Sequence, residues 1–547
     1  MSVLPVVLQR KSAAEGSLAA AYAAEDPRLE SILPADALRI AARRSPFSPS
    51  AAEPRGATPP PLSSSDFTTT SPVARATLDR VLSGEGALVT TGQQPGLFLG
   101  PLYTLYKALA AAELAARLER LWDVPVLPVF WVASDDHDWD EVATTHVIGH
   151  DGEVRTLRLS PPDGHAGRPV GAAPLTDSVL PLLHELEQSV GGPGFGDTYV
   201  GLMRDAYAPD RSVGEAFIDA MVALMESRPF ALIDAASPAL KRASVPVARH
   251  ALVEQAASEA ALRAGAERLE SAGFPATIPV LPDASFLFMD TGEERARLYV
   301  RNGIVSAGRD GPEMSLEAAL ERLDEEPERF SPNVALRPVL ESSLLPVAAT
   351  VLGPGELGYW AQLPDLFRLF DVAMPVVRPR MAWTILETKV ERMLDKLGAL
   401  PEDLADGAAG LLEGRIETER PAGVGAALAD LRGTLEAGFD RLETAVQSEL
   451  PGLRSAAGKA RAEAGKALKS FDRSVNSNLR ESQAVARERA ERAARHLYPD
   501  GYAQERFYTP VSYLARYGAE FVEVIAAEGR SRVWPGGPDV ALVDEPA

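Results

Sequence analysis

The alternation of apolar runs and polar clusters between residues 87 and 141 predicts two parallel strands joined by a helix. The segment consists of an apolar strand, a glycine-bearing turn, a helical run and a second apolar strand, at residues 87–91, 92–100, 103–121 and 126–133. Polar residues follow both strands directly. Because open α/β sheets bind ligands at the carboxyl ends of their strands, this pattern predicts an enzyme site.

The same order of apolar strand and polar end recurs later in the chain. Three further runs are predicted to be strands, at residues 229–234, 345–352 and 372–377. Between them, residues 284–300 resemble a β-hairpin around Gly292. We therefore predict an α/β fold whose parallel sheet is split by inserts. The strand ends near Gln93, His137 and Glu356 should converge on one cleft, because parallel strands end at one edge of their sheet.

From about residue 424 to residue 496 the pattern changes to that of a helical coiled coil. Leucines at spacings of three, four and seven form an apolar seam, at Leu428, Leu431, Leu435 and Leu442. Pro451 and Gly452 interrupt the run, so two antiparallel helices are expected. An intramolecular hairpin accounts for this pattern, and a role in dimerisation is compatible with it.

These patterns divide the chain into consecutive segments. They are an N-terminal segment and linker at 1–74, the first half of the core at 75–149, an insert at 150–225, a core strand with helices at 226–275, a β-rich insert at 276–335, the second half of the core at 336–395, a helical coiled coil at 396–500 and a C-terminal segment returning to the core at 501–547.

Composition limits the classes of function. The chain has 547 residues, 46% hydrophobic and 24% charged, which suits a soluble protein of several domains. Its net charge of −22 argues against nucleic-acid or anionic-membrane binding, which requires a basic surface. The absence of cysteine excludes disulfides, thiolate metal ligands and a cysteine nucleophile. Without an apolar run of about 18 residues or a convincing signal peptide, we expect a cytoplasmic protein.

The densest cluster of ionisable residues lies at 135–141, directly after the second strand. His137 stands between Asp136 and Asp138, where it could act as a base held in one tautomer or as a metal ligand. No familiar spacing of zinc ligands accompanies it, so no metal is predicted. A solvated acidic loop is the alternative, which the position at a strand end disfavours.

Glycine turns and arginines near other strand ends supply further candidates. The turn that holds Gln93, Gln94 and Gly96 precedes a helix, where backbone N–H groups can meet an anion, but it matches neither a Walker A loop nor G-x-G-x-x-G. Glu356 begins a helix after a second glycine turn and is either a cap or a ligand contact. The arginines that could hold a carboxylate or phosphate are Arg337, Arg378 and Arg380.

Several long motifs, in a fixed order, carry a resemblance to a known family. They are TGQQPGLFLGPLYT at 91–104, PVFWVASDDHDWDE at 128–141, LRP at 336–338, GPGELGYWAQL at 353–363, PR at 379–380 and QER at 504–506. Together they resemble the bacillithiol biosynthesis cysteine-adding enzyme family, over most of the chain from about 75 to 525. The first 70 residues and the tail after about 528 look less typical.

This resemblance implies a Rossmann-like core with inserted connecting segments, a C-terminal antiparallel α-helical coiled coil and a homodimer. It also implies a ligase that adds L-cysteine to the amine of glucosaminyl-malate to form bacillithiol. Amide formation from a free carboxylate requires activation, most simply by adenylation or phosphorylation. ATP or ADP is therefore the candidate nucleotide, and the family associates a nucleotide with the region near the coiled coil.

Site residues are then assigned to the parts of this reaction. The candidate base is His137, assisted by Asp136 or Asp138. Contacts with the substrates are assigned to Gln93, Gln94, Gly96, Glu141, Arg337, Glu356, Arg378 and Arg380, and contacts with a nucleotide to Gln504 and Arg506. Alternatively, Glu505 and Arg506 only lock the helical hairpin to the core through an ion pair.

Two rival functions remain open from sequence. One is a different adenylate-forming ligase or nucleotidylyl transferase on the same fold. The other is a non-catalytic scaffold that works through its coiled coil, which the density of polar residues at the strand ends disfavours.

Overall fold

The structure is a computed structural model that describes residues 6–10, 16–38, 62–165, 168–419, 422–482 and 484–531. The chain forms two compact units, the first from the described parts of 8–384 and 505–531, the second from 6–7 and 385–504. The chain passes between the units within β1 (Val6–Arg10), β15 (Trp383–Glu387) and α21 (Gln504–Phe507). Most of the predicted N-terminal linker and the tail after residue 531 lie outside the described residues.

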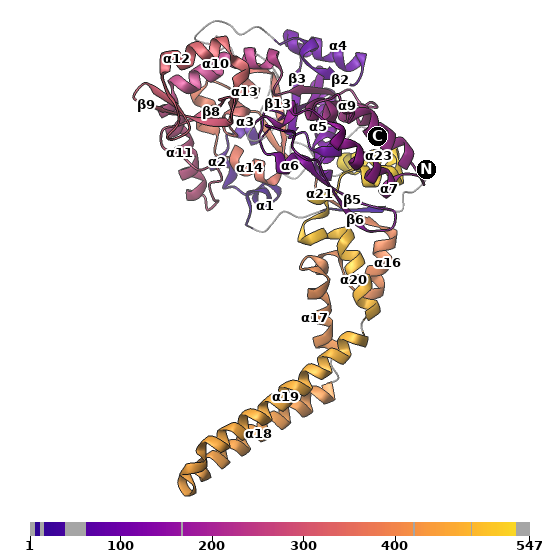
Figure 1. Cartoon of the computed structure of the whole chain (residues 1–547). Coiled ribbons are helices and arrows are strands. Elements are labelled where there is room, and N and C mark those ends of the chain that lie inside the picture. Colours follow the sequence, from indigo (N-terminus) through magenta and orange to yellow (C-terminus); the bar gives the residue numbers. More distant parts are fainter. Residues whose placement is uncertain are drawn as a thin grey trace. The chain divides into compact units, whose positions relative to one another are not determined.

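A six-stranded sheet lies in the first unit (Figure 1). Its strand order is β14 (Val376–Pro379), β13 (Val347–Leu352), β3 (Ala87–Gln93), β4 (Val126–Val132), β7 (Ala231–Asp234) and β2 (Thr68–Thr69). Neighbouring strands are parallel, except that β2 runs antiparallel to β7. The predicted Rossmann-like parallel core is therefore confirmed, with a short antiparallel strand added at one edge.

Helices cover both faces of this sheet. Every residue of β4 is buried, as expected for a strand in the middle of a parallel sheet. Its alternate residues, such as Val129, join an apolar cluster with α4 (Pro72–Arg80) and α13 (Leu336–Leu344). Phe130 points to the opposite face, where its ring meets Phe217 of α9 (Val213–Leu224).

A five-stranded antiparallel sheet forms a second layer of apolar packing in the same unit. Its order is β11 (Glu313–Ser315), β10 (Ile304–Ala307), β9 (Arg295–Arg301), β8 (Ala284–Asp290) and β12 (Phe330–Pro332). It shares an apolar cluster with the helices α10 (Pro238–Val253), α11 (Gln255–Ser271) and α12 (Leu316–Glu325). The predicted hairpin is confirmed as β8 and β9, and Gly292 supplies the positive φ that their turn requires.

The first unit contains further helices and strands. They are α1 (Leu18–Ala23), α2 (Leu29–Ile32), α3 (Ala35–Leu38), α5 (Leu102–Trp122), α6 (Trp139–Ala143), β5 (Thr144–Ile148), β6 (Val154–Arg158), α7 (Leu180–Val190), α8 (Gly196–Ala206), α14 (Pro354–Trp360), α15 (Pro364–Leu369), α22 (Val511–Tyr517) and α23 (Ala519–Ser531). The C-terminal helices α22 and α23 contact α8 and α5, so the end of the described chain packs on the core.

The second unit is helical. It contains α16 (Thr388–Leu397), α17 (Gly407–Glu419), α18 (Ala422–Glu449), α19 (Arg454–Ser482) and α20 (Ala484–Leu497). Helices α18 and α19 lie side by side and are joined at Pro451–Leu453, which confirms the predicted hairpin (Figure 1). Its seam is only partly covered, because Leu435 is half-buried whereas Leu431 and Leu442 are 45% and 46% exposed. No helix within the described residues is both long and apolar enough to cross a bilayer.

Gly265 of α11 offers a test of how closely the helices pack around the core. A Cβ at this position would lie 1.9 Å from the carbonyl oxygen of Gln362. We expect Gly265→Ala to lower the free energy of unfolding by about 1–3 kcal/mol, because backbone would have to move. Gly201→Ala in α8, where a Cβ meets nothing within 4 Å, should be neutral or stabilise by up to about 1 kcal/mol. Chemical denaturation of both variants measures this, and equal stabilities would contradict the packing.

Candidate active site

A cleft of about 570 Å³ lies where the predicted strand ends meet. Its walls come from the turns after β3, β4 and β13 and from the antiparallel sheet. The cleft is lined by nine of the residues singled out from sequence, namely Gln93, Gln94, Asp136, His137, Glu141, Arg337, Glu356, Arg380 and Arg506. The expected convergence of the strand ends near Gln93, His137 and Glu356 is confirmed, while the roles assigned to these residues stay predictions.

Two other predicted residues have structural roles in the backbone beside the cleft. Asp138 does not line it; its carboxylate caps α6 by accepting a hydrogen bond from the backbone N–H of Glu141 at 3.2 Å. Gly96 also lies off the lining, and a Cβ there would come within 2.8 Å of the Cα of Gly100. Gly96 is thus required for the close approach within its turn.

Arg378 and Gln504 are likewise absent from the lining of the cleft. Arg378 is fully buried, and its Nη1 donates to the hydroxyl of Tyr22 at 2.9 Å. Gln504 belongs to the second unit, where its side-chain amide exchanges hydrogen bonds with the backbone N–H and carbonyl of Ile385. Neither side chain contributes to the lining, so the substrate contact expected of Arg378 and the nucleotide contact expected of Gln504 find no support in their positions.

The segment after β4 forms the acidic wall of the cleft. Oδ1 of Asp136 accepts a hydrogen bond from the backbone N–H of His137 at 2.7 Å and lies 3.1 Å from its Nδ1. Oδ2 of Asp136 accepts from Nε2 of Gln94 at 2.6 Å. When Nδ1 carries the proton and donates to Asp136, Nε2 of His137 keeps a free lone pair, as a base requires.

Glu141 adds a second carboxylate to this wall. Loss of hydration, together with the nearby carboxylates of Asp138 and Asp136, raises the pKa of Glu141 above its ordinary value. Because the charged form of Glu141 is disfavoured, a cationic ligand beside it would stabilise the carboxylate. The acidic wall is therefore suited to an ammonium group.

Lys107 and Glu356 link the two glycine turns that line the cleft. Lys107 is 2% exposed, and its Nζ lies 2.5 Å from Oε2 of Glu356. The same ammonium donates to the carbonyl of Gly92 at 2.7 Å and to Oε1 of Gln93 at 3.0 Å. Burial lowers the pKa of Lys107, and Glu356 opposes that shift. Glu356 also accepts from the N–H of Gly353, so it caps α14 and faces the cleft at once.

The predicted arginines on the cleft already have partners. Arg337 pairs with Glu341 at 2.7 Å. Arg380 forms a bidentate pair with Glu505, at 2.8 and 2.9 Å. Their guanidinium groups thus neutralise buried carboxylates of the protein itself, and their contact with a substrate stays a prediction. The predicted ion pair near the C-terminal motif exists, but it is made by Glu505 with Arg380.

Two other guanidinium groups on the cleft have no acidic partner among the described residues. Arg297 lies over the ring of Phe288, with its Cζ 4.5 Å from the ring centroid. Arg506 is exposed and lies 6.0 Å from the ring centroid of Tyr103. An anionic ligand can therefore use these two groups without displacing a protein carboxylate.

The contribution of the antiparallel sheet was missed from sequence. Arg295, Arg297 and Phe288 all come from β8 and β9 and line the cleft. The spacing of two residues between Arg295 and Arg297 places both side chains on the same face of a strand, which is the signal that was available. In the part of the chain that the structure describes, no group of His, Asp and Glu is arranged to hold a metal ion.

Comparisons with known proteins agree with this architecture. The family model for the bacillithiol biosynthesis BshC N-terminal Rossmann-like domain matches residues 63–381, and that for the BshC C-terminal coiled-coil domain matches residues 383–530. A relative from Salinibacter ruber, named "Putative cysteine ligase BshC", is 33% identical over 453 residues, or 82% of each chain. Relatives of the same name from Symbiobacterium thermophilum and Koribacter versatilis are 32% and 31% identical, covering 81% and 83% of this chain and 82% and 84% of their own. With both domains matched and these identities sustained over most of its length, the chain belongs to the bacillithiol biosynthesis BshC family.

Proposed function

We propose that this protein is a ligase that adds L-cysteine to the amine of glucosaminyl-malate, forming the amide bond of bacillithiol. The observation that carries the proposal is the polarity of the cleft. Asp136 and Glu141 form an acidic wall beside His137, whereas Arg297 and Arg506 offer guanidinium groups without acidic partners among the described residues. An amino sugar joined to a dicarboxylic acid has the matching charges.

The reaction requires an amine nitrogen without its extra proton. The acidic wall would bind the ammonium form, and Nε2 of His137 would accept one proton from it, with Asp136 holding the ring through Nδ1. The amine then attacks the activated carboxyl carbon of cysteine and the C–N bond forms. The carbon–oxygen bond to the activating phosphate group breaks, and the second proton of the nitrogen leaves with that phosphate. Glu141 would stabilise the cationic nitrogen before its deprotonation.

We propose a nucleoside triphosphate as the source of activation, with Arg506 as the phosphate contact. The exposed guanidinium of Arg506 lies beside the ring of Tyr103 at the same cleft that holds His137. A planar guanidinium suits bidentate contacts with phosphate oxygens. Gln504 is not proposed to contact the phosphate, because its amide is hydrogen-bonded to backbone groups.

Product analysis tests the function directly. Purified protein would be incubated with cysteine and glucosaminyl-malate, with ATP, with ADP and without nucleotide, and the products identified by mass spectrometry. Formation of bacillithiol supports the proposal, and its dependence on ATP identifies the activating group. No product in any mixture, together with pyrophosphate exchange driven by a different acid, would favour another adenylate-forming ligase.

We expect His137→Gln and Asp136→Asn to reduce turnover by about 10²–10⁴-fold, because a positioned base commonly contributes that much. Asp138→Asn is the matched control. Its carboxylate caps α6 outside the lining, and asparagine caps helices as well as aspartate does, so turnover should stay close to wild type. The three variants are compared by initial rates, after circular dichroism has shown equal folding. Full activity in both His137→Gln and Asp136→Asn would remove the proposed base.

Arg297→Met should raise the KM for glucosaminyl-malate by about 10–100-fold, since a hydrogen bond to a charged group contributes about 1.5–3 kcal/mol. The KM for cysteine should change little. Arg309→Met is the control, because Arg309 also lies over an aromatic ring, that of Tyr299, but not on the cleft. If both variants alter the two KM values equally, Arg297 is not the carboxylate contact.

We propose that the helical hairpin supports a homodimer. Leu442 and Phe471 are 46% and 55% exposed on a pair of long helices with few buried side chains, so a second copy would cover them. The double variant Leu442→Asp with Phe471→Asp should shift sedimentation from dimer to monomer at micromolar concentration. Gln447→Asp adds a charge at an exposed polar position and should leave the dimer intact. A wild-type protein that sediments only as a monomer would refute this proposal.

A further inference from the structure

The short strand β12 is bound by two buried cations. Nζ of Lys241 in α10 donates to the carbonyl of Phe330 at 2.9 Å. Nε of Arg295 in β9 donates to Oγ of Ser331 at 2.8 Å, and its Nη2 donates to the carbonyl of Pro332 at 3.1 Å. The side chains of Lys241 and Arg295 are only 6% and 7% exposed. Three consecutive residues of β12 thus accept hydrogen bonds from two cations that are almost fully removed from water.

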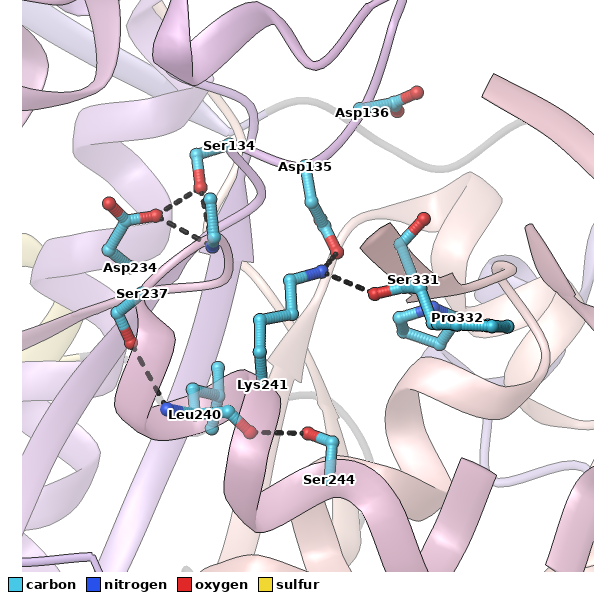
Figure 2. A network of polar contacts seen from close by, with 12 residues as sticks. Ser134, Asp135, Asp136, Asp234, Ser237, Leu240, Lys241, Ser244, Ser331 and Pro332 are labelled. Carbon is cyan, nitrogen blue, oxygen red and sulfur yellow. Dashed lines mark hydrogen bonds and ion pairs between the residues drawn. The ribbon is translucent and has the colours of Figure 1, made fainter. Parts of the chain in front are cut away.

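Each of these cations also holds one residue of the acidic segment after β4. Nζ of Lys241 lies 3.0 Å from Oδ2 of Asp135, and Figure 2 shows its side chain reaching between Asp135 and β12 while Asp136 points away. Nη1 of Arg295 lies 3.9 Å from Oδ1 of Asp136, the oxygen that faces Nδ1 of His137. The two cations therefore tie two neighbouring residues of the acidic segment, Asp135 and Asp136, to β12.

The Arg295 guanidinium is fixed in orientation as well as in position. Its Nε and Nη2 donate to Ser331 and Pro332, and its Nη1 faces Oδ1 of Asp136. Its Cζ lies 4.0 Å from the centroid of the Phe288 ring. A guanidinium directs its donors in one rigid plane, whereas an ammonium is a single point of charge. A lysine at this position could keep the charge but not the three directions.

We propose that Lys241 and Arg295 are positioning residues that clamp the acidic segment to β12 and thereby place the His137 ring in the cleft. The expected effect on turnover rests on the proposed function, whereas the clamp itself does not. It gives the antiparallel sheet a part in the reaction: the sheet sets where the ring stands relative to the substrate. Lys241 itself does not line the main cleft, so its influence passes through Asp135.

The charged groups around Asp135 stabilise its contact with Lys241. Asp135 is faced by Lys241 from α10 and by Arg295 from β9, and the carboxyl of Asp234 lies close by at the end of β7. Burial alone would raise the pKa of Asp135, but Lys241 and Arg295 hold it below its ordinary value. Asp234 in turn is hydrogen-bonded by Ser134 and by the backbone N–H of Ala236 (Figure 2). Removing Lys241 would leave a carboxylate buried without its nearest cation.

The first test uses Arg295→Lys and Lys241→Met in the full-length protein. Hydrogen–deuterium exchange of peptides covering residues 132–143 requires no substrate. We expect faster exchange there in both variants, with the central strands β3 and β13 unchanged. The controls are Arg301→Lys, on the exposed end of β9, and Arg242→Met, exposed on α10 beside Lys241. Unchanged exchange in the segment, or an equal increase throughout the unit, would overturn the clamp.

Turnover is a second measurement. A residue with a purely structural role would not change the kcat of the folded protein. We expect Arg295→Lys and Lys241→Met to lower kcat by about 10–100-fold, because small misplacements of a catalytic group have effects of this size. The KM for cysteine should stay within about twofold, since neither change removes a proposed contact with that substrate. A kcat equal to wild type in folded Arg295→Lys protein would overturn the positioning role. If His137→Gln is fully active while exchange still accelerates in the clamp variants, the base assignment fails and the clamp stands.

The pH dependence of stability tests the Asp135 partnership separately. In wild type, the lowered pKa of Asp135 makes its contribution to stability present above its ordinary pKa and lost as the pH falls. In Lys241→Met that carboxylate is disfavoured when charged, so the loss of melting temperature should be largest near neutral pH and shrink on acidification to about pH 5. Combining Lys241→Met with Asp135→Asn should restore most of the melting temperature at neutral pH. A deficit that neither acid nor Asp135→Asn relieves would overturn the partnership.

Discussion

A charge that is removed from water has to be compensated inside the protein. The ion pairs that compensate such charges hold the walls of the cleft together. The buried or half-buried pairs around it are Lys107–Glu356, Arg337–Glu341, Arg380–Glu505 and Lys241–Asp135. Breaking a buried pair leaves an uncompensated charge, which costs about 3–5 kcal/mol. Most of these pairs join elements that are distant in sequence, so the shape of the cleft depends on them.

The same pairs decide which groups remain available for a ligand. Arg337 and Arg380 line the cleft but already neutralise protein carboxylates. Arg297 has only an aromatic ring beneath it, and the described residues provide no carboxylate for it. The cleft is consequently acidic around His137 and cationic on the antiparallel sheet. The proposed substrate, an amino sugar that bears carboxylates, has charges that match this separation.

The antiparallel sheet therefore does more than enlarge the core. Through Arg295 it reaches Asp136, which holds the His137 ring, and through β12 it meets the ammonium of Lys241. The parallel sheet brings the acidic segment to its carboxyl edge, as its topology requires. The exact place of the ring within that edge then depends on a separate layer of structure, whose residues come from an insert between core strands.

The parallel core, the β8–β9 hairpin, the convergence of strand ends and the helical hairpin were all determined by the sequence alone. Each follows from the spacing of apolar residues and from the geometry of parallel strands, which are local or regular properties. The partners of the charged side chains were decided only by the tertiary structure. Arg380 and Glu505 are 125 residues apart, and Arg378 turns to Tyr22 while Arg380 turns to the cleft. No local pattern carries this information, because whether a cation is free or paired depends on which distant carboxylate the fold places beside it.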